Sequence, residues 1–481
     1  MEDVTEMTKK TKIICTMGPN TNDRELLKQM ALKGMDIARF NFSHGDHKEH
    51  LHRLELVRSV REELGIPIAT LLDTKGPEIR TGVVPNDGKV ELKEGQKFTL
   101  TTDDSSMTDE NHTSITYSGL AQDVSIGDTI LIDDGLIELK VLKISQPGEI
   151  LCEVENGGML GSRKGINVPN VSVRLPNITD KDKEDILFGI DQGFDYIAAS
   201  FVRNAACIRE IKDLLWSHNA DIPVIAKIEN SEGIRNMDEI IRTADGVMVA
   251  RGDMGVEIPS EDVPHIQKEL ISRCNNAYKT VITATQMLDS MIRNPRPTRA
   301  EVTDVANAIY QGSDCIMLSG ETANGKYPLQ ALQMMSKIAS TTEKYLPDES
   351  EEMLKAHSKR GIASAVCSAV VETAKNLHAK AIICPSMTGY TVRTISKLRP
   401  ASLIIGCSPN EQVLRRMQIY WNVKPVRTTQ ETSTELVITH AIEASLQEGL
   451  IEEGDTVIVS AGIANDNLIK GRTNMMRVVM V

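Results

Sequence analysis

The stretch IPVIAKIENSEGIRNMDEIIRTADGVMVARGDMGV, residues 222–256, decides the fold of this chain. It contains two apolar runs, 222–228 and 246–250, and charged residues stand at or just after the end of each. The segment between them carries isoleucine and methionine at positions 234, 237, 240 and 241, which is helical spacing. A strand–helix–strand unit of this kind predicts two parallel strands. Their carboxyl ends would lie at the same edge of a sheet.

Two charged pairs follow from this arrangement. Residues two apart on a strand share a face, so we expect Lys227 beside Glu229 and Arg251 beside Asp253. The two carboxylates would lie about one strand spacing (~4.8 Å) apart. Ionised carboxylates at that distance need a cation between them. This predicts a divalent-metal site that holds an anionic, phosphorylated ligand; the alternative is two surface ion pairs.

Composition limits the function classes. The 481 residues suggest two to four domains, and the net charge of −13 argues against nonspecific binding to nucleic acid or anionic membranes. Aromatic residues make up only 3% of the chain, too few for stacking on single-stranded nucleic acid. No apolar run reaches membrane-spanning length, and the N-terminus lacks the apolar core of a signal peptide. The eight cysteines form no CxxC pair, so we expect buried thiols in a reducing, cytoplasmic compartment and no cysteine-based zinc site.

The apolar runs continue along the chain and alternate with helical patterns. Eight near-continuous runs occupy 12–16, 35–41, 67–73, 195–201, 222–228, 246–250, 280–286 and 313–319. Polar residues stand at their ends: Thr16, Arg39, Asn41, Asp73, Ser200, Lys227, Glu229, Arg251, Asp253, Thr285, Ser319 and Glu321. This count predicts a (β/α)8 TIM barrel with its active site at the carboxyl ends of the strands. An open doubly wound sheet also explains the rhythm, but explains less well the polar residue at every strand end.

Two further regions depart from the barrel pattern. Between about 81 and 173, short runs with partial alternation and frequent turn residues predict a small inserted β-barrel lid domain. After a charged segment at 347–359, which is typical of a linker, the α/β rhythm resumes. The expected domains are 1–80 and 174–346 for the barrel, 81–173 for the lid, and 360–481 for a C-terminal α/β regulatory or oligomerisation domain.

Several cations are candidates for phosphate binding. Arg39 should point into the barrel mouth, whereas Arg80 and Lys164 stand at the two hinges of the inserted domain. A lid with cations at both hinges could close over the mouth and exclude water. The alternative for each is solvated surface charge. His44 could contact a phosphate or cap the following helix.

The residues at the mouth also suggest roles in chemistry. Glu229 and Asp253 suit Mg²⁺ or Mn²⁺, which take one or two protein carboxylates together with substrate oxygens. Lys227 could stabilise an enolate or a moving phosphoryl group; a Schiff-base role is the rival, disfavoured by the adjacent carboxylate. Thr285 and Ser319 could relay a proton or cap helices.

A second set of oxygen donors follows two earlier strands. It consists of Asn41, Ser43, Asp73 and Thr74. One charge with several neutral oxygens suits a monovalent cation better than a divalent one. Such residues also cap helices and turns, so their pattern alone leaves both interpretations open.

At this point the chain resembles the pyruvate kinase family over essentially its whole length. The blocks that are similar, in family order, are ARFNFSHG, LLDTKGPEIRTG, LGSRKGINVP, IPVIAKIENSEGI, MVARGDMGVEIP, TATQMLDSMI, NPRPTRAEVTDVANAI and DCIMLSGETANGKYP. The resemblance implies phosphoryl transfer from phosphoenolpyruvate to ADP, giving pyruvate and ATP, as the last step of glycolysis. It also implies dependence on Mg²⁺ and K⁺.

The resemblance carries roles onto matching residues. It implies that Lys227 stabilises the transition state, that Glu229 and Asp253 bind Mg²⁺, and that Arg39, Gly252 and Thr285 contact substrate, with Arg39 and Thr285 also counted among the catalytic residues. Asn41, Ser43, Asp73 and Thr74 match the K⁺ ligands, and Glu78 and Thr81 match the potassium-dependent branch. Asn41, His44, Arg80 and Lys164 match nucleotide contacts.

The C-terminal region matches the family less closely. PSMTGYTVRTI resembles an effector phosphate loop, with Ser386, Thr388, Gly389 and Thr391 as candidate contacts at a helix N-terminus. The final segment lacks the Gly-Trp and Pro-Gly of fructose-bisphosphate-regulated relatives, so a sugar phosphate and a nucleotide both stay open as effectors. The resemblance further implies a homotetramer. Two rival functions are an inactive effector-binding or scaffold protein, and a Mg²⁺-dependent enolate aldolase on the same barrel.

Overall fold

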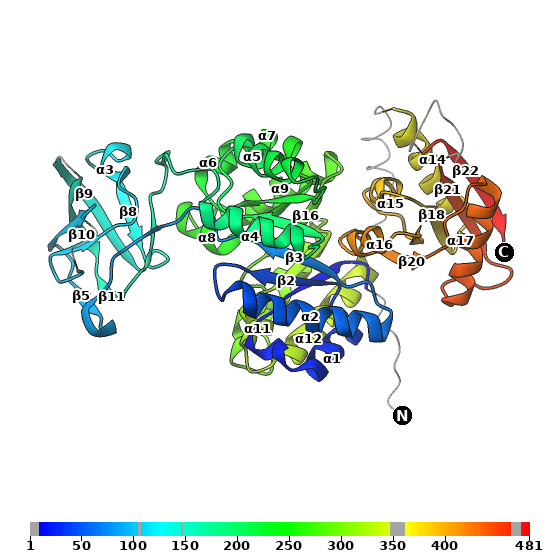
Figure 1. Ribbon diagram of the computed structural model, residues 1–481, viewed down its shortest axis with the longest axis horizontal. Helices are drawn as coiled ribbons and strands as arrows, with labels where there is room; N and C mark the ends of the chain where they lie inside the picture. The colour runs from blue at the N-terminus through cyan, green and yellow to red at the C-terminus, as the bar shows by residue number, and fades with distance from the viewer. Residues whose placement is uncertain (1–8, 104–106, 146–147, 347–360, 463–472) are drawn as a thin grey trace.

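The computed structural model describes residues 9–103, 107–145, 148–346, 361–462 and 473–481. The lid, the barrel and the C-terminal domain lie in a row, with the barrel in the middle (Figure 1). The segment expected to be a linker, 347–359, lies outside the described residues. Within them, no helix combines the length and the apolarity that crossing a membrane requires.

Eight parallel strands close into a barrel, in the order β1-β17-β16-β15-β14-β13-β3-β2. Their bounds are β1 (Lys12–Thr16), β2 (Ile37–Asn41), β3 (Ala69–Asp73), β13 (Tyr196–Ala199), β14 (Val224–Ile228), β15 (Gly246–Ala250), β16 (Thr280–Ala284) and β17 (Cys315–Leu318). One buried cluster draws side chains from all eight strands and fills the interior. Closure confirms the predicted (β/α)8 barrel and excludes the open sheet.

Helices cover the barrel between its strands (Figure 1). They are α1 (Arg24–Leu32), α2 (His47–Leu64), α4 (Asp180–Asp191), α5 (Ala205–Ser217), α6 (Ser231–Arg235), α7 (Met237–Thr243), α8 (Arg251–Glu257), α9 (Val263–Asn276), α10 (Arg299–Tyr310), α11 (Gly320–Ala323) and α12 (Pro328–Thr342). Short 3₁₀ helices occupy Pro19–Asn22, Pro85–Asp87, Asp289–Ile292 and Glu343–Tyr345. Side-chain caps explain several starts: capping boxes begin α4 at Thr179 and α10 at Thr298.

Two local predictions were wrong. The strand carrying Arg251 and Asp253 was expected to stay regular, but β15 ends at Ala250 and α8 begins at once. Both residues therefore lie in the first helical turn and do not share a strand face. The interpretation of His44 as a helix cap also fails, because the side chain of Asp46 caps α2 by accepting from the backbone of Glu49.

The inserted region forms a seven-stranded sheet in the order β4-β12-β8-β9-β10-β6-β7, with a β11-β5 pair beside it. An isolated antiparallel bridge between Thr81 and Ile115 pairs the two residues that directly follow the edge strands β4 and β7. The bounds are β4 (Ile79–Arg80), β5 (Val90–Leu92), β6 (Lys97–Thr101), β7 (His112–Ser114), α3 (Leu120–Asp123), β8 (Thr129–Ile132), β9 (Ile137–Ser145), β10 (Glu149–Asn156), β11 (Gly158–Leu160) and β12 (Gly165–Asn167).

The C-terminal domain is a five-stranded sheet in the order β20-β19-β18-β21-β22, in which only β22 runs antiparallel. Its elements are α14 (Ile362–Asn376), β18 (Ala381–Pro385), α15 (Tyr390–Ser396), β19 (Leu403–Ser408), α16 (Glu411–Met417), β20 (Val423–Arg427), α17 (Thr434–Gln447), β21 (Thr456–Ala461) and β22 (Met475–Met480). Two buried clusters pack the faces of this sheet.

Four aspartates form a repeated feature at the amino ends of the barrel strands. They directly precede β2, β13, β15 and β17, the second, fourth, sixth and eighth strands around the barrel. They are Asp36, Asp195, Asp245 and Asp314. Each carboxylate accepts a hydrogen bond of 2.7–2.9 Å from the backbone N–H of the preceding barrel strand. Each aspartate thereby satisfies a donor at the bottom of the barrel that would otherwise lack a partner.

Two of these aspartates also anchor the C-terminal domain. Nε of Arg415 on α16 donates to Oδ1 of Asp195 over 2.8 Å. Asp314 pairs with both Lys397 and Arg399, which follow α15. Asp195 and Asp314 are 0% and 1% exposed, so these ion pairs are shielded from solvent. The C-terminal domain is thus joined to the face of the barrel opposite its mouth.

Candidate active site

Four charged side chains meet at the carboxyl ends of β2, β3 and β14. Nε of Arg39 donates to Oδ2 of Asp73 over 2.6 Å. Nζ of Lys227 lies 3.0 Å from Oδ1 of Asp73 and 3.0 Å from Oε1 of Glu229. The four therefore form a row of alternating charge across the mouth, and the expected contact between Lys227 and Glu229 is present.

Because the row is buried, its charged side chains strongly affect one another's pKa values. Burial alone would raise the pKa of Asp73, but Lys227 and Arg39 outweigh it and hold that pKa below its usual range. Burial alone would lower the pKa of Lys227, but Asp73 and Glu229 outweigh it and raise that pKa. Both side chains are therefore charged at neutral pH, and Lys227 is an ammonium rather than the free amine that a Schiff base needs.

Glu229 and Asp253 carry more negative charge than their surroundings offset. Burial is the main cause that raises the pKa of Glu229 to about 7, and Asp253 adds to the rise while Lys227 opposes it. Burial likewise raises the pKa of Asp253. The buried carboxylate of Glu229 and the half-buried carboxylate of Asp253, which both resist ionisation, fit a divalent cation that would relieve their repulsion. No cluster of three or more His, Cys, Asp or Glu side chains suited to a metal occurs among the described residues.

Thr285 and Gly252 meet on the next side of the mouth. Thr285 follows β16 with a positive φ of 69°, and its Oγ1 accepts from the backbone N–H of Gly252 over 2.8 Å. Arg251 turns away and bonds Asp304 and the backbone carbonyl of Thr285, each over 2.7 Å. Arg251 therefore supports this turn and does not enter the charged row.

The four expected monovalent-cation ligands lie at the ends of β2 and β3. Asn41 and Asp73 are partners in the strand register, so their side chains start from neighbouring positions. Oδ1 of Asn41 accepts from the backbone of Ser43 over 3.1 Å, and Thr74 is 3% exposed. Asp73 already pairs with two cationic side chains, Arg39 and Lys227.

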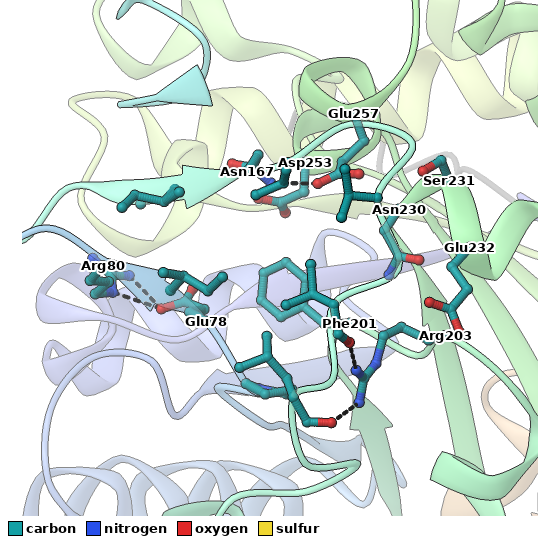
Figure 2. A pocket seen from close by; sticks show the side chains of 18 of the residues that line it. Glu78, Arg80, Asn167, Phe201, Arg203, Asn230, Ser231, Glu232, Asp253 and Glu257 are labelled. Carbon is teal, nitrogen blue, oxygen red and sulfur yellow. Dashed lines mark hydrogen bonds and ion pairs between the residues drawn. The ribbon is translucent and has the colours of Figure 1, made fainter. Parts of the chain in front are cut away.

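A cavity of about 310 Å³ lies between the lid and the barrel mouth (Figure 2). Its lining includes both hinge cations, Arg80 and Lys164, together with Asp253. Arg80 pairs with Glu78 and Lys164 pairs with Asp133. The structure thus brings the two hinge cations and one carboxylate of the expected metal site to one space.

A second cavity of about 400 Å³ opens beside Arg39. Asn41, His44 and Ser319 line it together with Gly18. Oγ of Ser319 is buried without a hydrogen-bond partner in the described residues. Oγ1 of Thr285 by contrast donates to the carbonyl of Ala284 over 2.6 Å.

The candidate effector loop lies after β18, in the C-terminal domain. Oγ of Ser386 accepts from the backbone N–H of Gly389 over 2.9 Å, and Gly389 adopts a φ of 77° just before α15. Thr388 is exposed, whereas Thr391 is buried and hydrogen-bonded to Thr473. Part of the final segment considered with this loop, 463–472, lies outside the described residues.

Sequence reasoning noted Ser200 only as a strand end and gave Phe201 no role. In the structure, Oγ of Ser200 accepts from Nζ of Lys227 over 2.7 Å. The backbone N–H of Phe201 donates to Oε2 of Glu229 over 2.7 Å. Both contacts depend on the turn after β13, and the only local signal was a polar residue ending an apolar run.

Comparisons with known proteins agree with this geometry. The family model "Pyruvate kinase, barrel domain" matches residues 8–332, and "Pyruvate kinase, alpha/beta domain" matches residues 364–479. Pyruvate kinase of Geobacillus stearothermophilus is 49% identical over 480 residues, covering 99% of this chain and 81% of that protein. Pyruvate kinase of Clostridium acetobutylicum is 46% identical over 474 residues, covering 98% of this chain and 99% of that protein.

A solved structure gives the same result at the level of the fold. The crystal structure of a pyruvate kinase from Cryptosporidium parvum superposes with a TM-score of 0.93 at 42% identity. The match covers 98% of this chain and 96% of that one. With the two family models and the near full-length relatives, it leads to one conclusion: this chain belongs to the pyruvate kinase family and is a phosphotransferase.

Proposed function

We propose that this chain transfers the phosphoryl group of phosphoenolpyruvate to ADP, giving pyruvate and ATP, through the charged row at the barrel mouth. The observation that carries the proposal is the position of Lys227, whose ammonium contacts Asp73 and Glu229 within 3.0 Å. Phosphoryl transfer needs positioning and charge stabilisation more than covalent chemistry, and a fixed buried cation supplies both.

Arg39, Lys227 and Gly252 have separate roles toward the substrate. Arg39, oriented by Asp73, offers its remaining N–H groups to the phosphate of the substrate. Lys227 offsets negative charge on the moving phosphoryl group and then on the enolate oxygen. The backbone N–H of Gly252, at the start of α8, donates to Oγ1 of Thr285, and these two residues are assigned to the side of the mouth that contacts the same substrate.

Glu229 and Asp253 are the carboxylates that would hold Mg²⁺ or Mn²⁺, as their raised pKa values favour. When bound, this cation would neutralise charge on the substrate oxygens. Asn41, Ser43, Asp73 and Thr74 would hold K⁺. Side chains of the barrel and the lid perform the remaining tasks, including the exclusion of water.

The nucleotide is assigned to the two cavities beside the mouth. Arg80 and Lys164 would contact its phosphates from the lid, and Asn41 and His44 would line the space for the rest of the molecule. After transfer, the enolate needs a proton at its methylene carbon. Thr285 lies beside Gly252 and is assigned to the path of that proton.

The remaining assignments concern the domains, the oligomeric state and the effector site. We assign 1–80 and 174–346 to the catalytic barrel, 81–173 to the lid, and 360–481 to a domain for regulation and oligomerisation. A homotetramer is the proposed assembly. The loop with Ser386, Thr388, Gly389 and Thr391 is the proposed effector site, with Ser386 and Thr388 better placed than the engaged Thr391.

A coupled assay tests the activity and its rivals. Pyruvate formation from phosphoenolpyruvate is measured with ADP, Mg²⁺ and K⁺ each omitted in turn. We expect activity only when phosphoenolpyruvate, ADP and a divalent cation are present, and we expect K⁺ to increase it strongly. Absence of ADP-dependent pyruvate refutes phosphoryl transfer. Undiminished activity without any monovalent cation refutes the K⁺ role.

A further inference from the structure

The turn after β13 presents two groups to the charged row, and neither has a role in the proposed phosphoryl transfer. Ser200 and Phe201 directly follow β13, the fourth strand of the barrel, which lies between β3 and β14. Oγ of Ser200 contacts Nζ of Lys227, and the N–H of Phe201 contacts Glu229, each over 2.7 Å. One turn therefore touches both the ammonium and the adjacent carboxylate.

The three protons of the Lys227 ammonium have three acceptors. These are Oδ1 of Asp73 at 3.0 Å, Oε1 of Glu229 at 3.0 Å, and Oγ of Ser200 at 2.7 Å. A lysine ammonium has three donors and no acceptor, so these contacts define its rotation about the Cε–Nζ bond completely. Two of the acceptors are carboxylates, and the hydroxyl of Ser200 is the acceptor that orients the ammonium without offsetting its charge.

The hydroxyl of Ser200 is itself fixed. Its own proton has a carbonyl acceptor, the backbone oxygen of Thr74, at 2.6 Å, and a longer contact to Asp73 at 3.2 Å. A hydroxyl has one donor, so its lone pairs are left to receive the proton of Lys227. The backbone N–H of Ser200 also donates to Oγ1 of Thr74 over 3.1 Å. Ser200 is therefore tied at two points to the end of β3.

The backbone of the turn that carries Ser200 is strained. Phe201 adopts a φ of 53°, a region that bulky L-residues rarely enter. Gly76 lies so close that a Cβ there would sit 2.8 Å from Cβ of Ser200. Strain of this kind persists where the surrounding structure enforces it, and it clusters at sites where positioning matters.

We propose that Ser200 is a positioning residue for the reaction, whose hydroxyl fixes where the Lys227 ammonium, and therefore its positive charge, lies beside the phosphoryl group being transferred. Ser200 acts through Lys227 and does not itself touch the reacting atoms. The inference rests on the proposed function, since it assigns a role within that reaction. Loss of the hydroxyl keeps Lys227 charged but removes one of the three contacts that fix the position of its ammonium.

The expected signature is a fall in kcat with little change in KM. Misplacement of a catalytic group by about 1 Å can cost on the order of 100-fold, so we expect Ser200→Ala to lower kcat by roughly 10- to 100-fold. KM for phosphoenolpyruvate should stay within about twofold, because Arg39 does not contact Ser200 in the described hydrogen bonds. Ser200→Cys, which keeps the shape but offers a weak acceptor, should resemble Ser200→Ala.

Ser313→Ala is the matched control for loss of a buried hydroxyl. Ser313 is 1% exposed and shares a 2.7 Å hydrogen bond with Thr283, before β17 at the opposite end of the barrel. Its variant should lower the melting temperature as much as Ser200→Ala does, with kcat within about twofold of the wild type. Equal kcat losses in Ser200→Ala and Ser313→Ala would overturn the proposal.

A double-mutant cycle separates positioning from a general structural effect. Because Ser200 acts through Lys227, Ser200→Ala should change the residual kcat less than twofold in a Lys227→Met background, measured at high enzyme concentration. The same fold-loss in both backgrounds would overturn the inference. A wild-type chain without ADP-dependent pyruvate formation would refute the proposed function; an active wild type with unimpaired Ser200→Ala would refute only the role of Ser200.

Discussion

Nζ of Lys227 on β14 lies 3.0 Å from Oδ1 of Asp73 on β3, although β13 separates these two strands. The contact spans a strand because inward side chains of a closed barrel converge at its mouth. Asp73 is 0% exposed and pairs with Arg39 as well. One carboxylate therefore holds both cationic side chains of the charged row, Arg39 and Lys227.

Replacing Lys227 with methionine should abolish most of the activity. We expect kcat to fall at least ~1,000-fold, since the loss of a single preorganised donor already costs 100- to 1,000-fold in other enzymes. Divalent-cation binding should survive, because Glu229 and Asp253 remain. The measurement is the coupled assay together with Mn²⁺ titration, and near-normal turnover would refute the role of Lys227.

The same substitution should also weaken the fold. Removing one partner of a buried pair leaves uncompensated charge and costs on the order of 3–5 kcal/mol. Lys212→Met is the control, because Lys212 pairs with Asp245 over 2.9 Å while about a third of each side chain is exposed. That variant should show little change in urea midpoint.

Stability and metal binding should depend on pH through Glu229. Its pKa in the folded, metal-free chain is about 7, above the ordinary value of 4.5, so between these values the folded chain binds the proton more tightly than the unfolded chain. The metal-free protein should therefore lose stability as pH rises from about 4.5 through 7. Proton and cation compete, so Mn²⁺ should raise the melting temperature more at pH 8 than at pH 6.

Glu229→Gln provides the control for this pH dependence. Glutamine keeps the shape and the contact to the N–H of Phe201 but does not titrate. The contribution of Glu229 to the pH slope should disappear, and the gain from Mn²⁺ should fall at both pH values. Equal stabilisation of the wild type by Mn²⁺ at pH 6 and pH 8 would contradict the assignment.

Gly76→Ala should damage both stability and activity. Gly76 has a φ of 74°, and its new Cβ would lie 2.8 Å from Cβ of Ser200 and 2.9 Å from the ring of Phe201. The backbone strain costs roughly 1–2 kcal/mol, and the forced shift adds roughly 1–3 kcal/mol. Because the shift moves the turn that holds Lys227, kcat should fall with it.

Gly65→Ala is the matched control for Gly76→Ala. Gly65 follows α2 with a φ of 65°, and a Cβ added there would have no other atom within 4 Å. It should show the backbone cost alone, roughly 1–2 kcal/mol, with unchanged kcat. Equal stability and activity for the two variants would mean that crowding at Gly76 has no effect.

Arg415→Met should weaken the attachment of the C-terminal domain. Its partner Asp195 is 0% exposed, and methionine leaves that carboxylate without its cation. We expect a loss of ~3 kcal/mol in the unfolding free energy of the barrel with its docked domain, measured by urea denaturation. Arg427→Met, which removes an exposed pair with Glu411, should leave the urea midpoint nearly unchanged; equal shifts would argue against buried anchoring.

Sequence reasoning found the eight strands because apolar runs and polar ends repeat along the chain. It also placed Lys227 beside Glu229 correctly, since both lie on or next to one strand. It failed for Arg251 and Asp253, because a helix begins directly after β15 and local pattern could not show where the strand ends. It missed the four aspartates that precede alternate strands of the barrel, although each of them stands directly before its strand in the sequence.

The sequence by itself determined the alternation of strands and helices and the family to which the chain belongs. Only the tertiary structure decided that Asp73 and Ser200 share the ammonium of Lys227, and that Asp195 and Asp314 hold the C-terminal domain. The reason is physical. Periodicity records which face of an element is buried, a local property, whereas these contacts join residues from 27 to 220 positions apart when strands close into a barrel.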